Sequence, residues 1–135
     1  MGAVVVDTSV LLGVLDPGDA LHAAARDAVL AHRAAGHTLV IPASVLAEAL
    51  VGANRQGPAV AQRVEAAIDV LVDDVLPIDR PTTRSAAALR ARQPVIRLPD
   101  ALVLAAGRQI GALAVLTGDK RWLGVDDRVE LITPT

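Results

Sequence analysis

The stretch Val4-Val5-Val6-Asp7 near the start of the chain decides the fold class. Three consecutive β-branched residues that are followed at once by a carboxylate are typical of a short strand buried on both faces of a parallel sheet. Similar apolar runs recur at residues 38–41, 75–78, 112–116 and, more weakly, 129–132. Pro77 predicts that its run lies at a sheet edge or at the end of its strand, because proline cannot donate a ladder hydrogen bond.

Alanine-rich stretches with helical start and stop signals lie between the apolar runs. Asp19 and Ser44 are candidate N-caps for the first two stretches, and proline in the first turn begins the other three. The helices expected from these signals cover residues 19–35, 44–55, 58–72, 81–92 and 100–110. Strands that alternate with helices predict an α/β fold, with a central, mostly parallel sheet and helices on both faces. We expect residues 1–135 to form a single domain, because two cores would leave each half too small to be stable.

The composition excludes several classes of function. Hydrophobic residues make up 53% of the chain, while Phe, Tyr and Trp together make up 1%. This hydrophobic content excludes intrinsic disorder, and the scarcity of aromatics excludes a platform that stacks RNA bases. The lack of cysteine excludes disulfides, thiolate zinc sites and cysteine nucleophiles. Because we find neither a secretory signal nor an uncharged apolar run of about 18 residues, we expect a cytoplasmic protein without membrane contact.

A basic segment interrupts an otherwise acidic chain. The net charge is −2, yet residues 80–97 contain five arginines and no acid. We predict that Arg80, Arg84 and Arg97 hold an RNA backbone beside an acidic site, since carboxylates alone repel phosphate. The alternative is a solvated helix face without a ligand.

Four carboxylates stand at the ends of the expected elements. Asp7 directly follows the first strand, and Asp119 comes three residues after Leu116. Glu48 lies on a small, uncharged helix face, and Asp100 lies in the first turn of a helix that is apolar nearly all round. Each carboxylate taken singly also suits a turn, a helix cap or an exposed position. Together they predict a cluster of hard oxygen ligands for Mg²⁺ or Mn²⁺, suited to metal-assisted hydrolysis of phosphodiesters.

The motifs around these carboxylates resemble those of the PIN-domain ribonucleases, and more narrowly those of the VapC-type toxins of bacterial toxin–antitoxin pairs. In chain order, the motifs are residues 4–12, 41–48, 98–106 and 116–122. The resemblance covers essentially the whole chain and implies a three-layer α/β/α sandwich. It implies that the metal-binding, catalytic residues are Asp7, Glu48, Asp100 and Asp119. It also implies that the hydroxyls supporting this site belong to Thr8, Ser9 and Thr117.

The resemblance further implies an endoribonuclease that leaves a 3′-hydroxyl and a 5′-phosphate and that a cognate antitoxin inhibits. The mean hydropathy of +0.45 leads us to expect apolar interfaces, and residues 43–53 offer more apolar positions than one contact with the sheet needs. We therefore expect a homodimer contact and a groove for the antitoxin. A PIN-like module that binds RNA or protein without cleavage is the alternative. We interpret Trp122 as a packing residue, and the three histidines, His22, His32 and His37, as surface residues.

Overall fold

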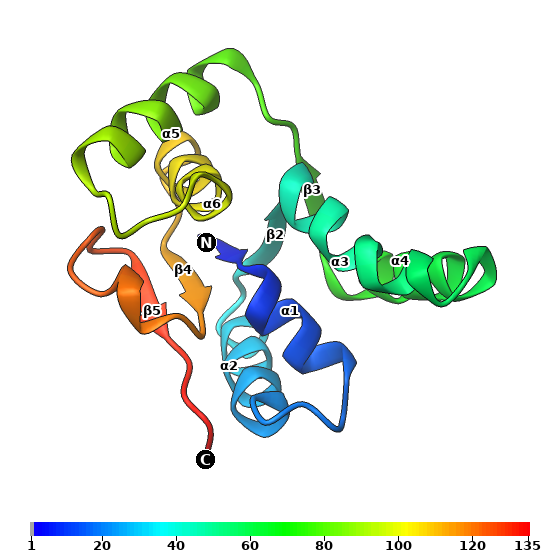
Figure 1. Cartoon of the computed structure of the whole chain (residues 1–135). Coiled ribbons are helices and arrows are strands. Elements are labelled where there is room, and N and C mark those ends of the chain that lie inside the picture. Colours follow the sequence, from blue (N-terminus) through cyan, green and yellow to red (C-terminus); the bar gives the residue numbers. More distant parts are fainter. Residues whose placement is uncertain (1) are drawn as a thin grey trace.

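The computed structural model describes residues 2–135 and has a five-stranded sheet at its centre (Figure 1). The strands are β1 Ala3–Val6, β2 Thr38–Pro42, β3 Asp74–Leu76, β4 Ala114–Thr117 and β5 Val129–Leu131. Every strand pair is parallel, and the spatial order of the strands is β3-β2-β1-β4-β5. The predicted α/β class and the parallel sheet are therefore confirmed.

Helices cover both faces of this sheet, which confirms the three layers. They are α1 Thr8–Leu15, α2 His22–Ala34, α3 Ala43–Arg55, α4 Pro58–Leu71, α5 Arg80–Arg92, α6 Leu98–Gln109 and the 3-10 helix η1 Lys120–Trp122. Helix α2, with α1 beside it, covers one face, and α3 and α6 cover the other (Figure 1). Helices α4 and α5 lie further out, because α4 packs on α3 and α5 packs on α6.

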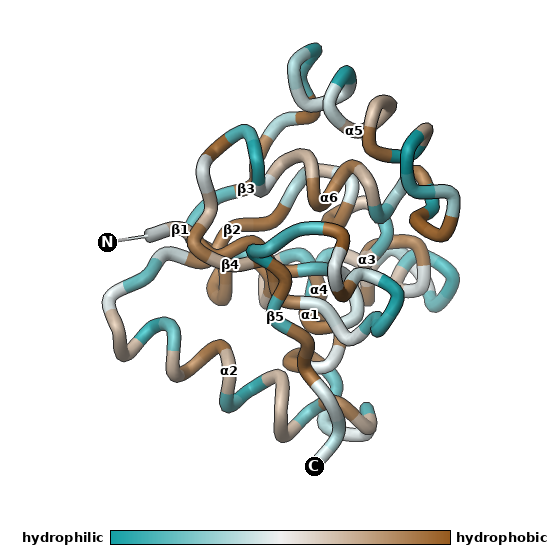
Figure 2. Tube along the Cα trace, turned by 90° about the vertical axis from the view of Figure 1, so that its left-hand side faces the viewer, coloured by the Kyte–Doolittle hydropathy of each residue, from teal (hydrophilic) through white to brown (hydrophobic). Residues whose placement is uncertain are grey.

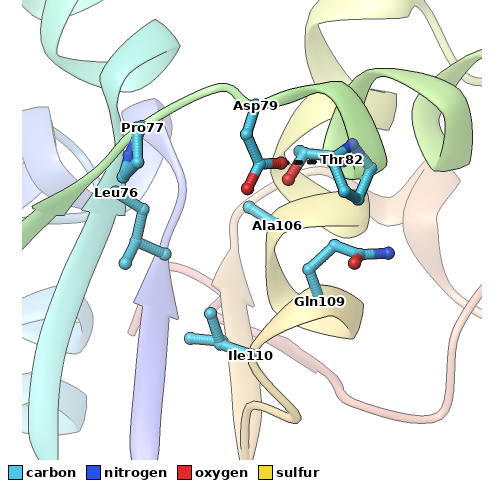
Figure 3. Close-up of a pocket in the computed structure, with 8 residues that line it drawn as sticks. Leu76, Pro77, Asp79, Thr82, Ala106, Gln109 and Ile110 are labelled. Atoms are coloured by element: carbon cyan, nitrogen blue, oxygen red, sulfur yellow. Dashed lines mark hydrogen bonds between the residues drawn. The ribbon is translucent and has the colours of Figure 1, made fainter.

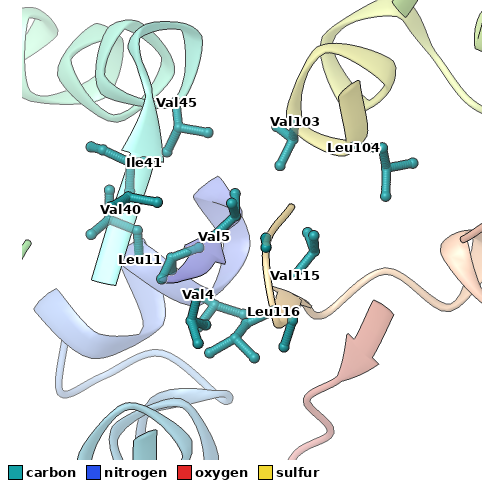
Figure 4. Packing of buried hydrophobic residues seen from close by; sticks show 14 of the residues in the cluster. Val4, Val5, Leu11, Val40, Ile41, Val45, Val103, Leu104, Val115 and Leu116 are labelled. Carbon is teal, nitrogen blue, oxygen red and sulfur yellow. The ribbon is translucent and has the colours of Figure 1, made fainter. Parts of the chain in front are cut away.

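Strand β1 is buried on both faces, as its unbroken valine run predicts. Its three valines are each at most 2% exposed. Figure 4 shows Val4 and Val5 in the packed core together with Leu11 of α1 and Val103 and Leu104 of α6. Figure 2 shows that hydrophobic residues concentrate along the central strands. Along the outer helices, hydrophobic and hydrophilic residues alternate. Trp122 is fully buried, which confirms its interpretation as a packing residue.

Helix α6 approaches the sheet so closely that one of its positions has room only for glycine. A Cβ added at Gly107 would lie 2.8 Å from Cγ2 of Val115 and 3.9 Å from Cγ2 of Val5. The first distance is shorter than any normal carbon contact, so α6 could not stay in place against a larger side chain. The position of α6 matters because this helix carries Asp100.

Two of the predicted N-caps are wrong. Asp19 Oδ1 accepts a hydrogen bond from the Leu21 backbone at 2.8 Å, so Asp19 shapes the turn before α2, and the helix begins only at His22. Ser44 lies inside the first turn of α3, whose N-cap is Pro42. The cause is local: β2 passes into α3 without a loop, which leaves no extended position for Ser44.

Helix α1 was not expected from the sequence. It is eight residues long and begins directly after β1, with Asp7 as its N-cap. Its apolar residues continue the valine run of β1, so periodicity does not separate the two elements. The edge prediction for Pro77 is confirmed, because β3 is an edge strand and ends at Leu76.

The three histidines are partly exposed, as surface residues are, but each is also hydrogen-bonded, which the sequence did not predict. His32 Nδ1 lies 2.9 Å from His37 Nδ1, and His32 Nε2 lies 3.2 Å from Glu130 Oε1. His22 Nδ1 lies 2.8 Å from the Gly13 carbonyl oxygen. The turn between α2 and β2 brings His32 and His37 together at a spacing of five, which a search for i,i+3 and i,i+4 pairs does not find. No helix within residues 2–135 has both the length and the hydrophobicity to cross a membrane.

Candidate active site

Asp7 lies at the carboxyl end of β1, where the strand order of the sheet reverses. β1 pairs with β2 on one side and with β4 on the other, so Asp7 stands at the topological switch point, where ligands bind in open α/β sheets. Asp7 Oδ1 accepts a hydrogen bond from the Thr8 backbone N–H at 2.7 Å and caps α1. The same residue therefore ends a strand and starts a helix. This fixes its carboxylate at the edge of the sheet where the strands have their carboxyl ends, which we call the rim.

Two hydroxyl groups hold the second oxygen of Asp7. Ser9 Oγ and Thr117 Oγ1 donate to Asp7 Oδ2 at 3.0 and 2.8 Å. Each hydroxyl also accepts a backbone N–H from the loop after β4: Ser9 Oγ from Gly118 at 3.0 Å, and Thr117 Oγ1 from Asp119 at 3.1 Å. This network joins Asp7 to the segment that carries Asp119, although 112 positions separate the two in the sequence.

Burial raises the pKa of the Asp7 carboxyl to about 6. The residue is only 7% exposed, and loss of hydration disfavours the charged form. The hydrogen bonds from Thr117, Ser9 and Thr8 lower this pKa, while the negative charge of Asp100 raises it further; burial has the largest effect. Asp7 thus carries a negative charge that the surrounding residues only partly compensate, a frequent property of functional sites.

Glu48 reaches the same rim from α3. Thr8 Oγ1 donates a hydrogen bond to Glu48 Oε1 at 3.2 Å, which places this carboxylate next to the first turn of α1. Glu48 is exposed and borders a groove between α1, α3 and α4, with a volume of about 500 Å³. The groove is lined by Leu12, Leu15, Asp16, Glu48, Ala49, Gly52, Ala53, Gln56, Val60 and Val64.

Asp100 lies in the first turn of α6 and is 8% exposed. Because α6 leads into β4 and runs back along the sheet, its N-terminal end lies at the rim formed by the carboxyl ends of the strands. Arg97 Nε donates to Asp100 Oδ2 at 3.4 Å, and the Arg97 side chain is itself 65% exposed. The negative charge of Asp100 contributes to the raised pKa of Asp7, so the two carboxylates are near each other at this rim.

Asp119 caps η1 and forms an ion pair with Arg121. Arg121 Nε donates to both carboxylate oxygens at 3.0 and 3.1 Å, and Arg121 Nη2 donates to Oδ2 at 2.5 Å. The Arg121 guanidinium, with a smaller contribution from the charge of Arg97, holds the pKa of Asp119 below its ordinary value. The four predicted carboxylates therefore lie along one rim. Asp7 follows β1, Asp119 lies between β4 and η1, and the other two are Glu48 on α3 and Asp100 on α6.

These carboxylates do not form a closed metal site. Within residues 2–135, no group of three or more His, Cys, Asp or Glu side chains lies close enough together to hold a metal ion. Asp100 and Asp119 are each hydrogen-bonded to an arginine. The chemistry of the donors still suits a hard divalent cation, since all four are carboxylates and Asp7 is buried with an incompletely compensated charge.

The three predicted RNA-binding arginines do not lie together. Arg97 is beside Asp100, but Arg80 begins α5, which packs on α6, and Arg84 lies one turn further along. The start of α5 adjoins the end of α6 around a small pocket of about 180 Å³ (Figure 3). That pocket includes Gln109, which is nine residues along α6 from Asp100, a distance of about 14 Å at the helical rise.

Sequence reasoning missed Arg121 as part of the site. Its position two residues after Asp119 in a strand-to-helix loop is the signal that could have identified it, because this spacing lets the side chain fold back onto a capping carboxylate. Sequence reasoning also did not predict the environment of Ser44. Its Oγ is enclosed near the start of α3 and has no hydrogen-bond partner within the described residues.

The fold and the site together define a class of α/β proteins with an acidic site at the carboxyl edge of a parallel sheet. A PIN domain family model matches residues 4–128. By sequence, no curated protein matches the chain. A chain of a toxin–antitoxin complex from Klebsiella pneumoniae superposes with a TM-score of 0.79 at 20% identity, over 98% of this chain and 99% of that one.

Two further structures show the same fold. VapC20 of Mycobacterium tuberculosis, a toxin that cleaves the sarcin–ricin loop, has a TM-score of 0.70 at 23% identity, over 90% of this chain and 95% of that one. VapBC2 of Rickettsia felis, bound to a promoter DNA fragment, contains a chain with a TM-score of 0.74 at 14% identity, over 98% of this chain and 99% of that one. Because the family model spans nearly the whole sequence, the chain belongs to the PIN-domain family.

Proposed function

We propose that this chain is a divalent-metal-dependent endoribonuclease and the toxin of a toxin–antitoxin pair. The observation that carries the proposal is the burial of Asp7 at the switch point, with its pKa raised to about 6 and Asp100 close enough to add to this shift. A bound cation would offset the repulsion between the buried Asp7 carboxylate and the nearby negative charge of Asp100. The family and the cleavage of RNA by the structurally similar VapC20 support this direction.

The residues divide the work of such a site. Asp7, Glu48, Asp100 and Asp119 would hold Mg²⁺ or Mn²⁺, which supplies an activated water and neutralises charge on the phosphate. Three neighbouring hydroxyls orient two of these carboxylates through the hydrogen bonds described above; they belong to Thr8, Ser9 and Thr117. Their role is to keep the oxygen donors in place before RNA arrives, so that little reorganisation is needed.

Cleavage of total RNA by the purified chain, with Mg²⁺ or Mn²⁺ and with EDTA, tests the proposal. Asp100→Asn should lower the rate by more than about 100-fold, because even changes behind a metal ligand cost 10- to 100-fold. Asp127→Asn is the matched control, since Asp127 is exposed and lies outside the rim. Activity that persists in EDTA, or full activity of Asp100→Asn, contradicts the assignment.

An antitoxin segment would occupy the groove between α1, α3 and α4. The groove is mostly apolar and includes Glu48 at the rim, so a chain seated there would lie directly beside the site. Several structurally similar proteins were solved as toxin–antitoxin complexes. Co-expression with the adjacent small gene should relieve growth arrest and give a stable complex, and Ala53→Asp in the groove should weaken that complex. Growth arrest without relief by the neighbour would contradict this part.

A homodimer remains part of the proposal. Val51 of α3 is 50% exposed and Val70 of α4 is 85% exposed, so apolar surface is available beyond the groove. Light scattering at micromolar concentration should report twice the monomer mass, and Val70→Lys should shift the mass toward the monomer. A monomer at all concentrations contradicts the dimer.

A non-catalytic PIN-like binding module is the second candidate. The observation in its favour is that no metal-binding group of three or more side chains forms among residues 2–135, while arginines pair with two of the acids. The two functions differ in one measurement: a binding module binds RNA or protein without any cleavage at added Mg²⁺ or Mn²⁺.

A further inference from the structure

Two arginine side chains of the chain itself pair with carboxylates of the acidic rim. Arg121 binds both oxygens of Asp119, and Arg97 binds one oxygen of Asp100. The charges also reach across the pairs, because Arg97 contributes to the lowered pKa of Asp119 and Asp100 contributes to the raised pKa of Arg121. The two arginines therefore act on the same charge cluster and offset part of it in the free protein.

The pair between Arg121 and Asp119 is the stronger of the two. It has three contacts of 2.5 to 3.1 Å, whereas the pair between Arg97 and Asp100 has one contact at 3.4 Å. A guanidinium that spans both carboxylate oxygens occupies the electron pairs that a metal ion would use. Arg121 and a cation therefore compete for Asp119.

The backbone at Asp119 stays fixed whichever partner its carboxylate has. Its N–H donates to Thr117 Oγ1 at 3.1 Å, and Thr117 is fully buried and bound to Asp7. The Arg121 side chain, in contrast, is 47% exposed. Release from Asp119 would thus move a long, partly solvated side chain and leave the loop in place.

Charge balance indicates where the released guanidinium goes. Four ionised carboxylates and two arginines leave the rim with an excess of negative charge that repels phosphate. A divalent ion removes that excess and takes over the neutralisation of Asp119. Arg121 then lies at the edge of the site with an unpaired fork of N–H donors, the geometry that binds phosphate oxygens in a bidentate way.

We propose that Arg121 alternates between two partners: it is the counter-ion of Asp119 in the ion-free protein, and it binds an RNA phosphate once a divalent cation takes that carboxylate. This inference rests on the proposed nuclease function. It differs from a general electrostatic role of the basic residues because it requires Arg121 to oppose cation binding and, only afterwards, to favour phosphate binding.

The first measurement is Mn²⁺ affinity by calorimetry, with the fluorescence of Trp122 in the same η1 turn as a second signal. Arg121→Gln should bind Mn²⁺ about two- to fivefold more tightly than the wild type, the range expected when a partly exposed ion pair no longer competes. Lys120→Gln is the matched control: Lys120 is exposed in the same turn and has no side-chain hydrogen bond or ion pair among residues 2–135. It should change the affinity by less than about 1.5-fold at 0.15 M salt.

The second measurement is the affinity for adenosine 5′-monophosphate, which has the expected 5′-phosphate end and no internucleotide bond to cleave. With Mn²⁺ present, Arg121→Gln should bind about tenfold more weakly than the wild type, since it lacks one charge-assisted contact. Without Mn²⁺ the two proteins should bind it equally, because Asp119 still holds Arg121. Arg121→Lys, which keeps the charge but loses the fork, should resemble the Gln variant in this assay.

The outcomes separate the two proposals. A wild type that binds no Mn²⁺ overturns the nuclease function and this inference with it. Mn²⁺ binding by the wild type, with Arg121→Gln indistinguishable from Lys120→Gln, overturns only the inference about Arg121. Tighter Mn²⁺ binding without a loss of nucleotide affinity overturns the phosphate role. Circular dichroism of each variant confirms that it is folded, which is expected because Arg121 is exposed.

Discussion

Asp7→Asn should make the metal-free protein more stable while abolishing its proposed activity. The Asp7 carboxyl has a pKa of about 6 in the folded protein and an ordinary value of 3.8. The folded state therefore binds the proton more tightly than the unfolded state, and between these two values the stability of the wild type falls as the pH rises. Above pH 6 the ionised carboxylate remains buried at a net cost to the fold.

The size of this cost follows from the two pKa values. They differ by roughly 2, and at 1.36 kcal/mol per pKa unit the full effect is about 3 kcal/mol. Asparagine resembles the protonated acid in shape and charge, so Asp7→Asn should gain about 3 kcal/mol at pH 8 and only about 0.5 kcal/mol at pH 4. For a chain of this length, the larger gain corresponds to a rise in Tm on the order of 10 °C.

Urea unfolding in EDTA, followed by the fluorescence of Trp122, measures this difference. Trp122 is the only tryptophan and is fully buried, so its emission reports global unfolding. Asp27→Asn on the exposed face of α2 is the control and should stay within about 0.5 kcal/mol of the wild type at both pH values. A variant at position 7 that is no more stable than the wild type at pH 8, or a gain that does not shrink at pH 4, refutes the reasoning.

Adding the cation should remove most of this difference in stability. At a Mg²⁺ or Mn²⁺ concentration of about 100 times the Kd, binding stabilises the wild type by about 2.7 kcal/mol, which nearly cancels the advantage of Asp7→Asn. The variant should show little change, because it has lost a ligand and a charge. Equal stabilisation of both proteins would place the cation elsewhere.

Three further predictions concern packing, the hydroxyl network and RNA binding. Gly107→Ala should lower the free energy of unfolding by about 1–3 kcal/mol through overpacking, whereas Gly52→Ala, with open space around its Cβ, should raise it by about 0.5–1 kcal/mol through helix propensity; urea unfolding that shows both variants stabilised would contradict the close approach of α6. Thr117→Val should cost about 1–3 kcal/mol, because the Asp119 N–H loses its acceptor and Asp7 Oδ2 keeps only the hydrogen bond from Ser9. An unchanged Tm would mean that the network is not formed. Arg97→Gln should flatten the salt dependence of RNA binding, measured by fluorescence anisotropy, and an unchanged slope would identify Arg97 as solvated surface.

The sequence by itself determined the fold class and singled out the four acids that we propose for the site. Buried parallel strands need unbroken apolar runs, so Val4-Val5-Val6 and its counterparts are recognisable without any tertiary information. A carboxylate that directly follows such a run must lie at the carboxyl end of its strand, which is why Asp7 could be placed at the rim. Glu48, Asp100 and Asp119 were selected because they stand in apolar or turn contexts.

Local signals failed where tertiary contacts compete with them. Asp19 and Ser44 have the side chains of helix caps, but the helix starts are fixed by the turn before α2 and by the direct passage from β2 into α3. His32 contacts both His37 and Glu130. Glu130 is 98 positions away from His32 in the sequence, so no local signal predicts this contact.

Only the tertiary structure decided what each acid touches. The pKa of Asp7 depends on its burial, and Thr117 contributes through a hydrogen bond across 110 positions. Arg80, Arg84 and Arg97 are close in the sequence but not in the structure. The packing of α5 on α6 places Arg80 and Arg84 at the end of this helix pair that is far from Asp100. Spacing along a chain determines the faces of single helices and strands, whereas distances between elements depend on how their buried surfaces pack, and that packing brought Arg121 rather than Arg80 or Arg84 to the acidic rim.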